Sequence, residues 1–480
     1  MNQRTTPTIL LVYPSSFYYP MEQERFEIKS SLLLLGSFLV QYFPVIYADF
    51  EITIGRPTGN IQIKRFERQV KAFLENQSYD ILAISCWTSL SYMATMSVAK
   101  IARELYPEKL VVVGGYHPSA IPEDFLTADN IIDYVIKGEG ELALMQIAEN
   151  YPTAKRPSET KIVAGATILP ENFIGMNWDI VESFLKTNFP AGLRSVALYL
   201  SRGCPFDCSF CMESLKERRW HPYPPEMAVN EVNSAAEQLK VSAINLGDAC
   251  FGLQSRWRKE FFTRLIERNP NFWITFETRP ELFDEEDVKL LSHLKVAIEL
   301  GVESFSPYIL GLMNKTKNPQ KFLDDFRKTS SLLNQYGIVH MANLIFNHPG
   351  ETERTLQETF AVVDELIDIS DSYLIWACHD YMHYPGSFLD RNKEQFEKEY
   401  GTRILVREWW KVNEDQLVNC RKVIPSSGLS DDKLKLWRSM YKERENRIKN
   451  SLHPDAFQFA AETYSPSWRR DPRYRPTTSK

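Results

Sequence analysis

The chain has 480 residues, of which 44% are hydrophobic and 25% charged, and its formal net charge is −6. This composition indicates a soluble globular protein of two or three domains, at roughly 150 residues per domain, and argues against a surface that coats nucleic acid. No run of eighteen apolar residues occurs and the seven cysteines are scattered, so we expect reduced thiols, a cytoplasmic protein, and neither a membrane nor a nucleic-acid partner.

Short apolar runs rich in β-branched residues alternate with amphipathic segments over residues 1–151. The runs predict strands at 9–12, 45–47, 81–84, 110–113 and 134–136, and the segments between them predict helices at 31–42, 63–76 and 92–105. Such alternation indicates a parallel sheet covered on both faces, in a doubly wound Rossmann-like α/β domain. Because such sheets bind ligands at the carboxyl ends of their strands, Ser85, Ser89, Gly114 and Gly115 are candidate binding residues.

Residues 152–190 contain several prolines and no strong period, and they are predicted to be a linker. A predicted strand over 196–200 then leads into a loop that carries Cys204, Cys208 and Cys211. Cysteines at spacings of four and three can turn three thiolates inward, which suits three corners of a 4Fe–4S cluster and leaves the fourth iron open. A structural zinc loop is the alternative, but it normally has a fourth Cys or His nearby, and His221 is the only nearby candidate.

This loop closely resembles that of the radical S-adenosylmethionine (radical SAM) superfamily, with Phe210 as the aromatic residue before the last cysteine. The resemblance implies that SAM chelates the open iron and is cleaved by an electron from the cluster. The resulting 5′-deoxyadenosyl radical then removes a hydrogen atom from a substrate. It also implies an electron donor, such as flavodoxin or ferredoxin, as a partner.

Six predicted βα units follow one another through residues 191–386, which predicts a partial TIM-like (β/α)6 barrel with its chemistry at the carboxyl ends of the strands. The predicted strands are 196–200, 243–246, 273–276, 296–300, 341–346 and 372–377. The remaining residues, 387–480, are predicted to be a helical region with a basic, proline-rich tail.

Four residues at the predicted strand ends are candidate SAM contacts. The resemblance places Asp248 at the SAM amino group, Glu303 at other polar groups of SAM, and Gly350 in a loop that supports adenine. Arg279 could pair with a carboxylate of SAM or of the substrate. Three of them have a plainer alternative: a rim ion pair for Glu303 and Arg279, and a turn with a helix cap for Gly350.

The N-terminal domain resembles the cobalamin-binding domain that precedes the barrel in one large radical SAM subgroup. The resemblance rests on the loops at 114–118 and 137–141. The stretch from Tyr13 to Arg25 lacks Asp-x-His-x-x-Gly, so no histidine is offered there as the lower ligand to cobalt. Cobalamin is therefore a possible cofactor, and a domain kept only as a scaffold is the alternative.

Cys378 follows the predicted sixth strand and is the candidate catalytic residue, because its thiol could donate a hydrogen atom to a carbon radical. The alternative is a small buried apolar side chain. Radical SAM peptide epimerases of the PoyD-like family, which this chain resembles, use such a thiol. The main expectation is therefore L-to-D epimerisation of residues in a ribosomally made precursor peptide. The alternative is a cobalamin-dependent radical SAM C-methyltransferase of a peptide or natural product, and a third class is a cluster-bearing protein that carries electrons.

Overall fold

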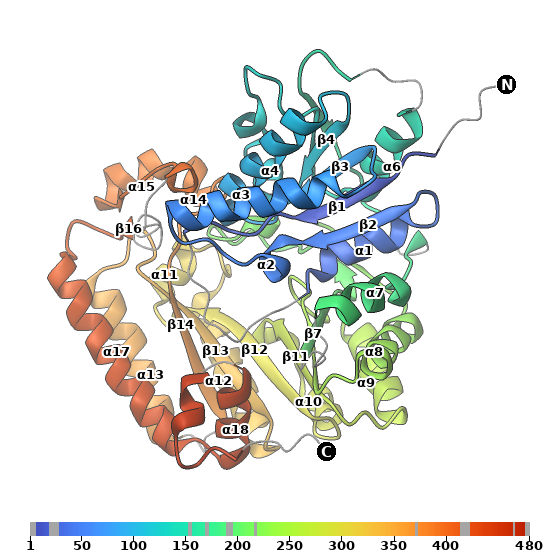
Figure 1. Cartoon of the computed structure of the whole chain (residues 1–480). Helices are drawn as coiled ribbons and strands as arrows, with labels where there is room; N and C mark the ends of the chain where they lie inside the picture. Colours follow the sequence, from blue (N-terminus) through green and yellow to red (C-terminus); the bar gives the residue numbers. More distant parts are fainter. Residues whose placement is uncertain are drawn as a thin grey trace.

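The computed structural model describes residues 6–18, 28–151, 156–168, 172–188, 195–215, 218–369, 373–412, 423–463 and 466–475. Two six-stranded parallel sheets organise these residues. Figure 1 shows the N-terminal sheet above the second sheet, with the C-terminal helices along one side of the second sheet.

The N-terminal sheet has the strand order β2-β1-β3-β4-β5-β6, and every neighbouring pair is parallel. Its strands are β1 (Ile9–Tyr13), β2 (Val45–Asp49), β3 (Ile81–Ser85), β4 (Leu110–Gly114), β5 (Tyr134–Lys137) and β6 (Lys161–Ala164). One face packs on α3 (Asn60–Glu75) and α4 (Tyr92–Leu105), and the other on α1 (Ser30–Leu39) and α6 (Glu141–Asn150). The predicted doubly wound domain is confirmed.

The predicted linker is wrong for two of its segments. Lys161–Ala164 forms β6, which pairs with β5 and extends the sheet, and Trp178–Asn188 forms α7. β6 is an edge strand whose side chains are mostly exposed, and its apolar run of Ile162, Val163 and Ala164 is too short to have predicted a strand. Within the predicted linker, residues 152–155, 169–171 and 189–190 lie outside the described residues.

The second sheet has the order β14-β13-β12-β11-β10-β7, which confirms the six βα units. Its strands are β7 (Ser195–Leu198), β10 (Ala243–Leu246), β11 (Trp273–Thr278), β12 (Val296–Glu303), β13 (Val339–Phe346) and β14 (Leu374–Asp380). The helices between them are α8 (Pro225–Leu239), α9 (Ser255–Glu267), α10 (Glu285–Leu291), α12 (Pro319–Gln335) and α13 (Glu353–Ile369). They bury the largest apolar core of the protein against the outer face of the sheet.

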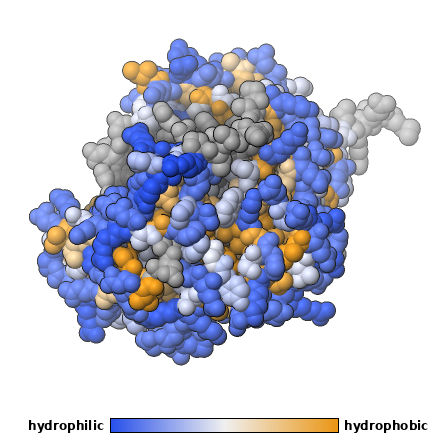
Figure 2. Space-filling view, turned by 90° about the horizontal axis from the view of Figure 1, so that it is seen from below, coloured by the Kyte–Doolittle hydropathy of each residue, from blue (hydrophilic) through white to orange (hydrophobic). Residues whose placement is uncertain are grey.

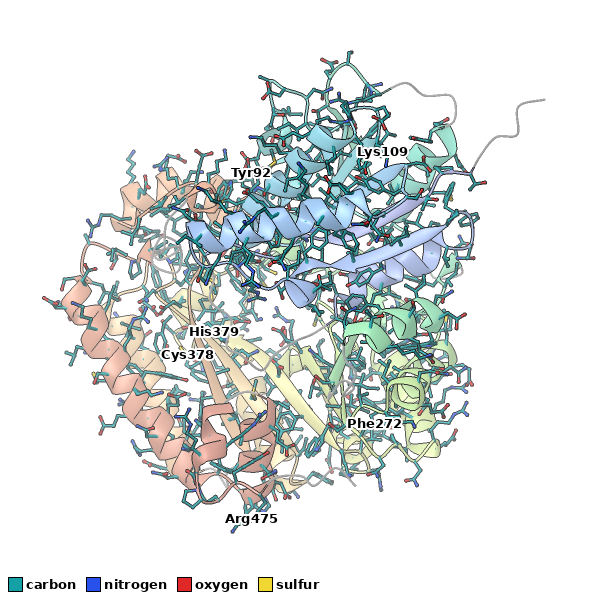
Figure 3. All side chains as sticks on the ribbon, viewed as in Figure 1. Tyr92, Lys109, Phe272, Cys378, His379 and Arg475 are labelled. Carbon is teal, nitrogen blue, oxygen red and sulfur yellow. The ribbon has the colours of Figure 1, made fainter. Side chains whose placement is uncertain are left out.

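The strand ends of the barrel sheet are oriented toward the N-terminal domain. Figure 3 shows Cys378 and His379, near the carboxyl end of β14, on the side of the N-terminal domain, and Phe272, just before β11, at the opposite end. Chemistry in such a barrel belongs at the carboxyl ends of the strands. The mouth of the barrel therefore faces the N-terminal domain.

The C-terminal region is helical, as predicted. It includes α14 (Phe388–Arg391), α15 (Lys393–Tyr400), α17 (Asp431–Ser451) and α18 (Pro454–Thr463), with a small antiparallel pair of β15 (Arg403–Ile404) and β16 (Val423–Ile424). The start of the basic tail is packed, because the Trp468 ring stacks on Phe457 at 5.6 Å between centroids.

No helix among the described segments is long and apolar enough to cross a membrane. Figure 2 views the molecule from below Figure 1 and shows a mainly hydrophilic face, with apolar side chains gathered in separate small groups.

Candidate functional site

The cysteine loop is closed at its base by a short hairpin. β8 (Ser201–Arg202) pairs antiparallel with β9 (His221–Pro222) on either side of the loop. The buried Asp248 carboxylate holds the start of the loop, since it accepts hydrogen bonds from the Leu200 N–H at 3.3 Å and from the Ser201 hydroxyl. Both Asp248 oxygens therefore face the loop, and the structure favours a loop-holding role over the predicted contact with the SAM amino group. Burial raises the pKa of Asp248 to about 6.

The far side of the loop is anchored to the barrel rim. The Ser209 N–H donates to the Met313 carbonyl at 2.8 Å, and the Ser209 hydroxyl donates to the Leu312 carbonyl at 3.0 Å. Phe210 packs against the apolar group of Tyr381, Leu389 and Phe396. Phe210 is thus an anchor of the loop, and its contribution to the SAM site stays a prediction.

The three predicted cluster ligands lie on one loop. Cys204 and Cys208 are buried, and Cys211 is half-buried on the same loop. Burial raises the pKa of Cys211 to about 12, and the neighbouring Cys208, Cys204 and Glu277 add to the rise. Iron would displace the thiol protons, as metal binding to cysteine does generally.

Arg279 and Glu303 both lie in ion pairs at the rim, as the plainer alternative expected. Arg279 Nη2 lies 2.6 Å from Glu281 and donates to the Lys315 carbonyl at 2.7 Å, and its guanidinium lies 3.9 Å from the centre of the Phe206 ring. Lys315 Nζ lies 2.9 Å from Glu303 Oε1, beside a β-bulge that gives Glu303 a φ of +72°. Arg279 Nη1 is buried and has no partner among the described residues, so it can still take an acceptor from SAM.

Sequence reasoning missed Lys315, which no motif marks because it lies in the turn before α12. Its burial beside Cys208, Glu303 and Arg279 makes it a cation at the cluster loop. The attraction of Glu303 and Cys208 holds the Lys315 pKa above its ordinary value despite that burial.

Gly350 follows β13 in a left-handed conformation, with φ of +87°. Its N–H donates to the Pro425 carbonyl at 2.8 Å, and a Cβ here would lie 2.7 Å from Leu312 Cδ1. The backbone therefore requires glycine at this position. The support of adenine by this loop stays a prediction.

Polar side chains line the barrel lumen on alternate positions of the strands. Glu277 of β11 is exposed to the lumen and is in register with Glu299 of β12, whose Oε2 accepts from Asn343 Nδ2 at 3.3 Å. His379 of β14 is also exposed. Glu277 is enclosed by the barrel wall although it borders the lumen. Desolvation by this enclosure, together with the charges of Glu303 and Glu299, raises the pKa of Glu277 to about 7. Sequence reasoning missed these residues, although their polar character inside strands was a usable signal.

We expect Glu277→Gln to stabilise the protein at high pH. A raised carboxyl pKa means that the folded state binds the proton more tightly than the unfolded state does. The contribution of this proton to the free energy of unfolding is therefore fully present below about pH 4.5 and is lost as pH rises through about 7. Thermal unfolding without added SAM should show a higher midpoint for the variant at pH 8 and little difference at pH 4.5. An equal shift at both values would show that the effect is not the charge.

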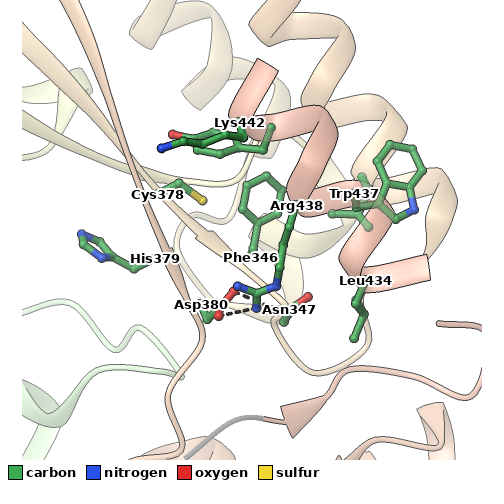
Figure 4. A pocket seen from close by; sticks show the side chains of 11 residues that line it. Phe346, Asn347, Cys378, His379, Asp380, Leu434, Trp437, Arg438 and Lys442 are labelled. Atoms are coloured by element: carbon green, nitrogen blue, oxygen red, sulfur yellow. Dashed lines mark hydrogen bonds and ion pairs between the residues drawn. The ribbon is translucent and has the colours of Figure 1, made fainter. Parts of the chain in front are cut away.

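Cys378 does not face the lumen. It is in register with Leu344, an apolar core residue of β13, whereas its neighbour His379 is in register with Ile345. The charged groups that act on its thiol are Asp380, Glu351, Arg438 and Glu445, and none is a lumen carboxylate. Figure 4 shows the thiol directed toward α17 and His379 directed away. The expectation that Cys378 faces a substrate across from SAM is thus wrong on this geometry, because one residue along a strand reverses the face.

The predicted binding loops of the N-terminal domain lie together at the carboxyl edge of its sheet. Ser85 ends β3 and Gly114 ends β4. Gly115 has φ of +119°, and a Cβ there would lie 2.5 Å from the Cys86 carbonyl oxygen, so only glycine fits. Ser89 is buried, with its hydroxyl 2.8 Å from His117 Nδ1.

The carboxyl edges of the two sheets meet face to face. Arg202, in the hairpin below the cysteine loop, forms ion pairs of 2.6 Å with both Glu139 and Glu141, which follow β5. Gly386, after β14, approaches Ala120 of α5 (Tyr116–Ala120), since a Cβ on Gly386 would lie 2.8 Å from Ala120 Cβ. The cysteine loop and the predicted cobalamin loops therefore border one space between the domains.

Comparison with known proteins agrees with this arrangement. The radical SAM superfamily model matches residues 198–363, and the B12 binding domain model matches residues 32–148. An uncharacterized methyltransferase of Pyrococcus horikoshii is 25% identical over 60% of this chain and 64% of its own length. An anaerobic magnesium-protoporphyrin IX monomethyl ester cyclase of Rubrivivax gelatinosus is 25% identical over 72% of this chain and 63% of its own length. The chain thus spans somewhat less than two thirds of each of these relatives.

One solved structure covers nearly the whole fold. The radical SAM methyltransferase TsrM from Kitasatospora setae, with cobalamin and a 4Fe–4S cluster bound, superposes with a TM-score of 0.65 at 16% identity, over 94% of this chain and 90% of TsrM. Its identity is low, so this likeness shows the fold alone. The cysteine loop and the two family matches show that the chain is a radical SAM protein, with a 4Fe–4S cluster and SAM as its cofactors and an N-terminal domain of the B12-binding type.

Proposed function

We propose that this protein is a cobalamin-dependent radical SAM methyltransferase that acts on a carbon atom of a peptide or other natural product. The observation that carries the proposal is the opposition of the two carboxyl edges, held by the Arg202 ion pairs to Glu139 and Glu141. A cofactor on the N-terminal edge and SAM on the cluster would both border a substrate at the barrel mouth. The P. horikoshii relative, named a methyltransferase, supports this reaction class.

The position of Cys378 disfavours epimerisation. An epimerase of the expected kind needs a thiol across the substrate from the adenosyl radical, and Cys378 lies behind β14 against α17. The other cysteine at a strand end, Cys250, is buried beside Cys204 and the cluster loop, on the SAM side. Neither thiol is placed to quench a substrate radical from the opposite face.

The N-terminal edge suits cobalamin. The left-handed Gly115 lets its loop pack closely on the Cys86 carbonyl, and Ser85, Ser89 and Gly114 border the same edge. When bound, cobalamin supplies a carrier for the methyl group. The residues of this chain would hold it against the mouth of the barrel.

The direct test compares protein with and without cobalamin. Cluster-loaded enzyme is incubated anaerobically with SAM, a low-potential reductant and peptides encoded beside its gene, in deuterated water. Methyl transfer predicts that S-adenosylhomocysteine forms only with cobalamin, and that the product gains the mass of a methyl group less one hydrogen. Cys378→Ala should behave as the parent does. A product that instead carries one deuterium and no added methyl group, and that disappears in Cys378→Ala, would establish epimerisation.

Cobalamin on this protein should have no histidine below the cobalt. His117 stands at the right edge, but Nδ1 lies 2.8 Å from Ser89 Oγ and Nε2 lies 3.1 Å from Asp124 Oδ2, so both nitrogens are engaged. Burial also lowers the His117 pKa, against the opposing effect of Asp124. An electron paramagnetic resonance spectrum of the cobalt(II) form should lack nitrogen superhyperfine splitting. Splitting that changes on labelling with 15N-histidine would contradict this expectation.

A further inference from the structure

A cavity of about 300 Å³ lies between the barrel sheet and α17, outside the lumen. Its walls come from the ends of β13 and β14, from α13, and from one face of α17 (Figure 4). The α17 residues are Leu434, Trp437, Arg438, Tyr441 and Lys442, spaced as the inward stripe of an amphipathic helix is. This volume is at the lower end of the range for sites that bind small molecules.

The helix that borders the cavity, α17, packs incompletely on the barrel. Only Leu434 and Ile448 of the 21 residues of α17 are buried, and Trp437 and Tyr441 are half-buried although both face the sheet. Protein interiors are normally close-packed, and a void bordered by Phe346, Leu356 and Trp437 loses the contacts that would fill it. An apolar occupant would restore those contacts.

One buried donor points to the chemistry of the occupant. The Tyr441 hydroxyl is buried and has no hydrogen-bond partner in the part of the chain that the structure describes. Its ring is held edge-to-face on Phe346 at 5.3 Å between centroids, so the hydroxyl cannot swing freely to solvent. A buried hydroxyl without a partner is costly, and an acceptor atom on an occupant would satisfy it.

The cavity offers no unpaired charge to an ionic ligand. Arg438 is paired with Asp380, which also accepts from Asn347 Nδ2 at 3.0 Å, and Lys442 lies 2.7 Å from Glu445. The Cys378 thiol opens on the cavity, and burial raises its pKa well above the ordinary value, so it is uncharged. The α17 side of the wall is therefore electrically balanced, and His379, which also lines the cavity, is directed away from α17.

We propose that this cavity is a binding site for an uncharged aromatic or alicyclic group that carries a carbonyl or ether oxygen. The apolar body packs on Trp437, Phe346 and Leu356, and the oxygen accepts from the Tyr441 hydroxyl. The site opens beside Asn347 and Asp380, at the same strand ends as the barrel mouth. It depends on β13, β14, α13 and α17 alone, so it stands whether or not the protein transfers methyl groups.

The test uses Cys378 as a reporter in the full-length, cluster-loaded protein. Because the thiol is protonated, an excess of N-ethylmaleimide at alkaline pH alkylates it slowly through its small thiolate fraction, and mass spectrometry of the Cys378 peptide gives the rate. Saturating 1-indanone, an uncharged bicyclic ketone, should slow the reaction at least tenfold. Indane, which lacks the oxygen, should protect less, and indane-1-carboxylate, which is charged, should not protect.

Tyr441→Phe keeps the ring and removes the donor, so it should reduce protection by 1-indanone to that by indane. Tyr308→Phe, at a half-exposed tyrosine far from the cavity, should leave protection unchanged. In a second measurement 1-indanone should raise the thermal midpoint of the parent protein but not of Cys378→Phe, whose ring fills the cavity. The proposal fails if 1-indanone neither protects Cys378 nor raises the midpoint, or if Tyr441→Phe is protected as well as the parent.

Discussion

Replacing any one of Cys204, Cys208 and Cys211 with alanine abolishes both the brown iron–sulfur chromophore and the cleavage of SAM. Each cysteine is predicted to supply one of three protein ligands from a single loop, and a cluster that loses one of them has two open corners. We expect a loss of at least a hundredfold in SAM cleavage. Iron and sulfide analysis with anaerobic product assays measures both effects.

Cys250→Ala is the matched control. Cys250 is buried after β10, and its thiol lies near enough to Cys204 for their charges to interact, but it lies outside the cysteine loop. The variant should keep a full cluster and lose only the packing of a small buried side chain, about 1–2 kcal/mol. A loop variant that retains four irons per chain, or a Cys250→Ala protein that loses them, would overturn the ligand assignment.

We expect Arg202→Met to weaken the contact between the carboxyl edges of the two sheets. The guanidinium is largely buried between Glu139 and Glu141, and its removal takes the paired cation away from both carboxylates at the domain contact. Breaking one side of such a buried pair costs about 3 kcal/mol. That loss corresponds to a fall of about 6–12 °C in the thermal midpoint of a domain of this size. Because the contact fixes the distance between the edges, cobalamin-dependent formation of S-adenosylhomocysteine should fall more steeply than cluster content.

Arg218→Met gives the comparison for this prediction. Arg218 pairs with Asp207 on the cysteine loop at 2.7 Å, but both side chains are about half exposed. Exposed pairs contribute about 0–1 kcal/mol, so the midpoint should hardly move. Equal losses in the two variants would mean that Arg202 is merely another surface charge.

The positions of most strands along the chain were predictable because the signal for each strand is local. β1, β3 and β4 are short apolar runs, buried on both faces of the sheet, and such runs stand out between amphipathic helices. β6 escaped prediction because its apolar run of Ile162, Val163 and Ala164 is short, and because an exposed edge strand has no long buried run to mark it. Its partner β5 defines it, and that partner lies more than twenty residues earlier.

The cysteine loop and the positions of Gly115 and Gly350 at strand ends could also be predicted from the sequence. Three cysteines within eight residues constrain one another whatever surrounds them, and Gly115 and Gly350 follow predicted strands where a left-handed turn is common. The roles of Asp248, Arg279 and Glu303 were less readable. Their partners are Ser201, Glu281 and Lys315, and only packing decides which oxygen each donor meets.

The sequence by itself determined two parallel sheets and a three-cysteine loop at the end of a strand, and the resemblance of that loop to the radical SAM superfamily implied a cluster with SAM. Only the tertiary structure decided that Cys378 faces α17 and His379 the lumen, that Glu277 and Glu299 stand side by side, and that Arg202 joins the two carboxyl edges. The physical reason is range. Spacing along the chain constrains groups a few residues apart, whereas the face that a strand residue presents depends on register and on neighbours brought from distant segments.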